Sequence, residues 1–167
     1  MWRRTITFLL SLLSMVMAEA TNHYFKHLGV SDGLSQVCIP SIYQDELGAV
    51  WLGTTEGLNR YNGKDVKVFQ PSESNHGLTN NEINELCGDK NGRMYIRSGN
   101  DLIKLDIYTE QFTCLRQKGV YGLFCKKDTL WVSCADGIYY YTGQGTELTF
   151  FARVQKGFVG RALYVDK

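Results

Sequence analysis

A pattern of strand-forming and turn-forming residues recurs at fixed offsets along this chain, and it restricts the possible folds more than any other feature of the sequence. The offset is 44 residues between the first and second copies, without a gap from position 33 to position 62, and 80 residues between the first and third copies. The recurring residues are Asp45, Gly48, Trp51, Gly57 and Leu58 in the first copy, Asp89, Gly92, Tyr95 and Leu102 in the second, and Trp131 and Gly137 in the third. Such a long register indicates one supersecondary unit repeated along the chain.

The first copy contains the strands and turns of a small antiparallel sheet. Its first turn spans 45–48, where Asp can bond its own backbone and Gly can take positive φ. Strands are predicted at 50–52 and 58–61, and Asn62-Gly63 predicts a hairpin into a further strand at 66–69. A repeat of about 40 residues with four strands and a Trp beside a turn is typical of a β-propeller blade. The alternative, an all-β sandwich, gives no reason for the conserved register.

The fold class predicted from this repeat is all-β: a partial β-propeller with about three four-stranded blades plus the first strand of a fourth. The blades are predicted at 35–70, 80–115 and 120–152, with the next starting at 160. The innermost strands of the first two are expected near 37–43 and 81–86, and the first turn of the third, Lys126 to Asp128, is shorter and has no Gly. Because a propeller needs at least four blades, we expect a fragment of a longer protein, or a ring built from several copies.

The N-terminus has the features of a secretory signal peptide over residues 1–20. Arg3 and Arg4 form its positive end, an apolar stretch follows from 6 to 17, and the small residues around Glu19 predict cleavage after Ala20. The stretch is short for a membrane span, although an uncleaved anchor is the alternative. Residues 21–34 are predicted as a closing strand and linker, with a weakly held strand at 24–28. The sequence therefore predicts export to the periplasm.

Charge argues against nucleic acid as a direct partner. The chain has 18 basic and 17 acidic residues. Removal of a leader that ends at Ala20 takes away Arg3, Arg4 and Glu19, which leaves the two signs in equal number. A nucleic-acid-binding domain carries a basic patch or stripe, and none is evident here.

The five cysteines do not form a recognisable metal or redox motif. They stand at positions 38, 87, 114, 125 and 134, and no CxxC occurs. Cys87 takes the place of Tyr43 in the repeat, and Cys134 takes the place of Thr54, so both are interpreted as small strand residues that fill the core. We expect buried free thiols. A disulfide, which an oxidising compartment permits, and a metal or catalytic role remain as alternatives.

No catalytic, metal-binding or cofactor-binding residue is predicted. Asp45, Asp89 and Asp166 occupy equivalent turns on different blades, where Asp serves the turn itself. Glycoside hydrolysis needs two carboxylates about 5–10 Å apart, and equivalent turns do not supply such a pair. His23 and His27 lie in an extended segment, which separates them too widely for a shared metal, and no GxSxG, HExxH or phosphate loop is present. Ligand-binding residues stay unassigned.

Four groups of residues in the first copy resemble the two-component regulator propeller repeat. They are Gly33-Leu34-Ser35, the Gln44-Asp45 pair followed by Gly48, Trp51-Leu52-Gly53-Thr54, and Gly57-Leu58-Asn59-Arg60-Tyr61. The later copies depart from the pattern, with Tyr95-Ile96-Arg97-Ser98 and Trp131-Val132-Ser133-Cys134 at the third group.

The resemblance implies the sensor region of a hybrid two-component histidine kinase of the Bacteroidetes type. Such a protein would bind a glycan fragment with its propeller, act as a homodimer anchored in the inner membrane, and control transcription through phosphorelay domains that this chain lacks. The chain alone would then be no enzyme, and its partners would be an oligosaccharide, the remaining blades and the downstream signalling domains. The alternatives are part of an exported propeller enzyme acting on glycans, and a purely structural interaction module.

Overall fold

A computed structural model describes Trp2 and residues 25–71 and 77–154. The predicted signal peptide, its cleavage after Ala20, Asp166 and the strand expected from 160 lie outside these residues, apart from Trp2. In the described parts of the chain, no helix is long and apolar enough to cross a membrane. A 3-10 turn, η1 (Val30–Asp32), precedes the strands.

Twelve strands in the described residues form three four-stranded antiparallel sheets, and each strand pairs with its neighbour in sequence. The first sheet holds β1 (Ser41–Gln44), β2 (Val50–Thr54), β3 (Gly57–Tyr61) and β4 (Val66–Phe69). The second holds β5 (Ile83–Gly88), β6 (Arg93–Ser98), β7 (Asp101–Asp106) and β8 (Gln111–Arg116), and the third holds β9 (Val120–Lys126), β10 (Thr129–Cys134), β11 (Gly137–Tyr141) and β12 (Thr149–Ala152).

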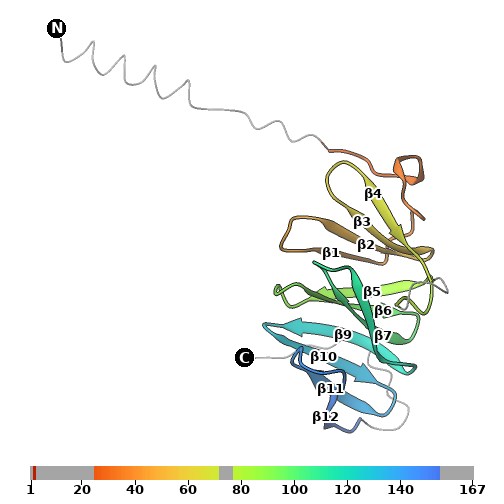
Figure 1. Cartoon of the computed structure of the whole chain (residues 1–167), viewed down its shortest axis with the longest axis vertical. Helices are drawn as coiled ribbons and strands as arrows, with labels where there is room; N and C mark the ends of the chain where they lie inside the picture. Colours follow the sequence, from red (N-terminus) through yellow and green to blue (C-terminus); the bar gives the residue numbers. More distant parts are fainter. Residues whose placement is uncertain (1, 3–24, 72–76, 155–167) are drawn as a thin grey trace.

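The prediction of an all-β partial propeller is confirmed. The three sheets follow one another along the long axis of the molecule, and the first strands β1, β5 and β9 lie side by side (Figure 1). We call the sheets blades 1, 2 and 3. Ile42 on blade 1 and Phe150 and Phe151 on blade 3 are more than half exposed, so apolar side chains remain uncovered on both end blades.

Blade 2 is buried on both faces, and the alternation of its side chains shows how. Met94 and Ile96 of β6 pack in a core with blade 1, whereas Tyr95 between them packs in a second core with blade 3. All three side chains are fully buried. Because successive residues of a strand point to opposite faces, a single apolar strand fills both junctions.

The turn residues of the repeat adopt the backbone conformations that their positions require. Gly48 and Gly92, in the first turns of blades 1 and 2, have φ of 85° and 83°, where a Cβ would be strained. The third copy has no Gly there, and Lys127 takes the left-handed conformation instead, with φ of 53°. The connection between β9 and β10 in this copy has two residues, as expected from the shorter turn predicted in the sequence.

One strand prediction is wrong in its bounds. The innermost strand of blade 1 begins at Ser41 rather than near residue 37, because Pro40 has no backbone N–H with which to extend the ladder. Residues 25–28, the described part of the weakly held strand expected at 24–28, pair with none of the twelve strands and leave Phe25 97% exposed, which agrees with weak attachment. Their role as a closing strand stays a prediction.

Candidate ligand-binding pocket

The aspartate that opens the first blade is a structural residue. Asp45 is 4% exposed. Its Oδ1 accepts hydrogen bonds from the backbone amides of Leu47 (3.0 Å) and Ala49 (2.8 Å), and its Oδ2 accepts one from Trp51 Nε1 (2.7 Å). One carboxylate thus shapes the turn and fixes the fully buried indole.

Most of the other recurring residues also lie in turns and cores, and Trp131 is half-buried. Asp89 bonds the amide of Asn91 (2.8 Å) and pairs with Arg93 Nε at 2.6 Å. A Cβ on Gly57 would lie 2.7 Å from the carbonyl oxygen of Phe69, and one on Gly137 2.6 Å from that of Ala152. The remaining residues of the set are Leu58, Tyr95 and Leu102, which are fully buried, and Trp131, which contacts the rings of Tyr140 and Phe151.

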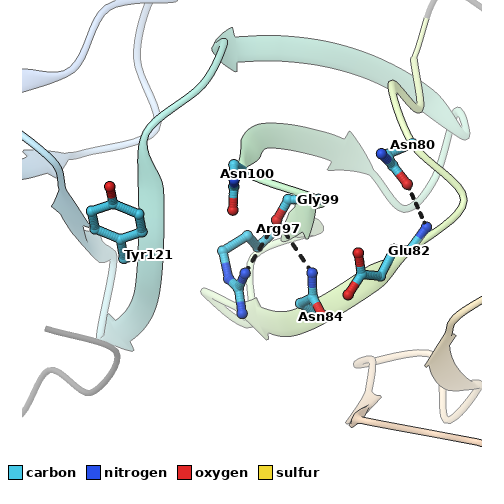
Figure 2. Close-up of a pocket in the computed structure, with 7 residues that line it drawn as sticks. All are labelled: Asn80, Glu82, Asn84, Arg97, Gly99, Asn100 and Tyr121. Carbon is cyan, nitrogen blue, oxygen red and sulfur yellow. Dashed lines mark hydrogen bonds between the residues drawn. The ribbon is translucent and has the colours of Figure 1, made fainter. Parts of the chain in front are cut away.

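A polar pocket of about 500 Å³ lies where blades 2 and 3 meet (Figure 2). Its lining comes from the segment that leads into β5 and the start of β5, from the end of β6 and the β6–β7 turn, and from the start of β9. The lining residues are Asn80, Glu82, Asn84, Arg97, Gly99, Asn100 and Tyr121. The volume falls in the range of small-molecule sites, about 300–1,000 Å³. Ligands of propellers sit on connections between successive blades, and the pocket uses such a connection, between β4 and β5.

Hydrogen bonds fix the lining around the β6–β7 turn. The carbonyl of Gly99 accepts bonds from Asn84 Nδ2 (3.3 Å) and from Arg97 Nη1 (3.1 Å), as Figure 2 shows. Asn80 Oδ1 accepts from the amide of Glu82 (2.9 Å), and the buried hydroxyl of Ser98 bonds both backbone groups of Asn80. The pocket wall is therefore held in place from within blade 2.

One carboxylate connects the two blades beneath the pocket. Glu85 Oε2 accepts a bond from Arg97 Nε (3.3 Å) and another from the amide of Leu123 on blade 3 (3.0 Å). Burial raises the pKa of Glu85, while the Leu123 amide and the Arg97 guanidinium oppose this change. Because Arg97 is already paired, the pocket offers no free positive charge to an anion.

The sequence carries a signal for this pocket in one departure from the repeat. Arg97 stands where the first repeat has Gly53, whose added Cβ would lie 2.7 Å from Ile83 Cγ2. The first blade junction therefore leaves no room at this position, while the second accommodates a long cationic side chain that lines a hollow. The departure from the repeat marks the site.

The prediction of buried thiols is only partly right. Cys134 is 2% exposed, but Cys38 and Cys114 are exposed, and Cys87 and Cys125 are half-buried. Cys38 does not lie on a strand, because β1 begins at Ser41. In the described residues, no group of three or more His, Cys, Asp or Glu side chains has an arrangement suited to a metal ion.

Comparison with known proteins matches residues 33–56 to the two-component regulator propeller family. The chain carries this propeller repeat. Histidine kinase P4 of Formosa agariphila is 40% identical over 53 residues, which make up 32% of this chain and 4% of that protein.

Solved structures agree with the repeat. The extracellular domain of the hybrid two-component system BT3049 of B. thetaiotaomicron is 26% identical, with a TM-score of 0.65 over 76% of this chain and 20% of that one. The corresponding domain of BT4673 shares the fold, with 17% identity and a TM-score of 0.58 over 80% of this chain and 21% of that one. This regulator propeller is thus akin to extracellular sensor domains of hybrid two-component systems, and spans about a fifth of the length of those domains.

Proposed function

We propose that this chain is part of the periplasmic sensor of a hybrid two-component histidine kinase, and that the pocket between blades 2 and 3 binds a neutral oligosaccharide fragment. The observation that carries the proposal is the lining of the pocket. Three amide side chains and one carboxylate offer both donors and acceptors to hydroxyl groups, and Tyr121 offers an aromatic ring. This combination suits a sugar, which has many hydroxyls and apolar C–H faces.

Electrostatics favours an uncharged sugar over an acidic or sulfated one. Arg97 is engaged by Glu85 and by the carbonyl of Gly99, and Glu82 adds a negative charge to the rim. An anionic ligand would meet this carboxylate without a free cation to balance it, so its desolvation would be poorly repaid.

Under this proposal the chain supplies recognition, not chemistry. Glu82 is the single carboxylate among the seven lining residues, whereas glycoside hydrolysis needs two. Signalling would require the remaining blades, a homodimer anchored in the inner membrane and downstream phosphorelay domains that control transcription.

A panel of neutral and acidic oligosaccharides, tested by calorimetry with the purified chain, examines this proposal. We expect a neutral fragment to bind, and we expect Asn84→Ala or Tyr121→Ala to weaken it about tenfold, the effect of losing roughly 1.4 kcal/mol of contacts. Asn81→Ala is the matched control, because Asn81 is an adjacent exposed asparagine outside the lining. Absence of binding to every sugar would favour a structural interaction module, and release of a cleaved product would favour an exported enzyme.

A further inference from the structure

Two cysteines from neighbouring blades meet at the junction of blades 2 and 3. Cys87 lies on β5 and Cys125 on β9, the adjacent innermost strands of blades 2 and 3, and their Sγ atoms are 2.7 Å apart. A disulfide bond length is about 2.05 Å, so the two thiols need only a small movement to become bonded. Both side chains pack against the core between these blades.

The same place at the other blade junction is filled in a different way. Tyr43 pairs across its sheet with Trp51, as Cys87 pairs with Tyr95, so these two residues are equivalent in the repeat. Tyr43 points at Gly88, which would clash with the phenol if it carried a Cβ. The junction between blades 1 and 2 is therefore filled by a large side chain, Tyr43, which packs against a glycine, Gly88.

At the junction of blades 2 and 3 both of these residue types are replaced by cysteine. Cys125 pairs with Leu130 as Gly88 pairs with Met94, so it occupies the glycine position of the repeat. Burial alone would be served by one large residue and one small one, as in the first junction. Two facing cysteines instead allow a covalent connection.

We propose that Cys87 and Cys125 form a disulfide that clamps blades 2 and 3 together. The bond forms by exchange with an external disulfide, such as oxidised glutathione or a protein disulfide of an oxidising compartment. One thiolate attacks the external disulfide and releases one thiol, and the second cysteine then attacks the mixed disulfide and releases the other. The two cysteine thiols are oxidised, the external disulfide is reduced, and the two thiol protons end on the two external thiols that are released.

The clamp would act beside the pocket. Cys87 is two residues from Glu85, whose carboxylate bonds the amide of Leu123, itself two residues from Cys125. Oxidation would hold the two innermost strands at a fixed separation, and with them the parts of the pocket lining that come from β5 and β9.

Peptide mapping tests the bond directly, because trypsin places each of the five cysteines in a different peptide. The purified, reduced chain is incubated with oxidised glutathione, blocked with N-ethylmaleimide and digested. We expect peptide 68–90, with Cys87, to be linked to peptide 119–126, with Cys125, while the peptides of Cys38 and Cys114 carry label or glutathione. In urea this selectivity should vanish. Labelled Cys87 and Cys125 in the folded chain, or scrambled links, would overturn the proposal.

Thermal unfolding tests the clamp. Reduction of the oxidised chain should lower the melting temperature by an amount on the order of 10 °C. Cys125→Ala should abolish this difference between oxidised and reduced samples, and the control Cys114→Ser should keep it. An unchanged melting temperature on reduction would refute a stabilising clamp. Because the oxidant is added to purified protein, these outcomes are independent of export and of sugar binding.

Discussion

Removal of the Asp45 carboxylate provides a quantitative test of the role assigned to the repeated aspartate. In Asp45→Ala, the amides of Leu47 and Ala49 and the indole N–H of Trp51 lose their acceptor. Leu47 is 57% exposed and can bond water, whereas Ala49 and Trp51 are 5% and 0% exposed and cannot. An unsatisfied buried donor costs about 1–3 kcal/mol. Two of them predict a loss of about 4 kcal/mol in the free energy of unfolding.

The measurement is urea unfolding followed by circular dichroism, with Asp106→Ala as the matched control. Asp106 also accepts two turn amides, from Tyr108 (3.0 Å) and Thr109 (2.8 Å), but both residues are exposed. Water replaces the lost bonds there, so a cost of about 1 kcal/mol or less is expected. A double-mutant cycle with Trp51→Phe should give a coupling of about 1–3 kcal/mol with Asp45→Ala. Equal costs for Asp45→Ala and Asp106→Ala would refute the argument from burial.

Three further predictions concern the blade junctions. Burial raises the pKa of Glu85 above its ordinary 4.5, so the stability of the wild type relative to Glu85→Gln should fall as the pH rises above 4.5. A constant difference in urea unfolding would contradict this. Gly88→Ala places a methyl group against Tyr43 and should cost about 1–3 kcal/mol by the same assay, whereas no loss would mean that the ring moves aside freely. Glu110→Gln removes ion pairs to blade 1, including one to Arg60 (3.0 Å), and should cost about 1 kcal/mol or less, a difference that about 1 M NaCl should erase.

The fold was accessible from the sequence because the repeat constrains it at many positions at once. The alternation along β6, with Met94 and Ile96 on one face and Tyr95 on the other, is hidden in an unbroken apolar run. The 44-residue register identifies this apolar run as a strand within a blade, even though the run shows no alternation of apolar and polar residues. Local details were less accessible. The start of β1 depends on one missing N–H at Pro40. Whether residues 25–28 pair with a strand depends on which sheet edge is available to them, which a local pattern does not specify.

The pocket could not be assigned from one sequence because its lining comes from three separate segments. Asn84 and Tyr121 are 37 positions apart in the chain, and no local motif connects them. The bond from the amide of Val120 to the carbonyl of Asn100 (3.0 Å) brings the β9 start to the β6–β7 turn. Only the packing of whole blades produces this proximity, so the repeat predicts the blades but not the residues of the pocket.

Departures from the repeat are therefore the most informative part of this sequence for function. The turn aspartate, the turn glycine and the core aromatic residue serve the blade itself, so these residues report the architecture, although the first turn of the third copy has no glycine. The glycines that permit close blade packing in the first junction, Gly53 and Gly88, correspond in the next copies to Arg97 and Cys125. Both replacements lie at the junction of blades 2 and 3, one in the wall of the pocket and the other beside Cys87. Since glycine already satisfies the first junction, Arg97 and Cys125 are the departures on which the proposed ligand site and the proposed disulfide rest.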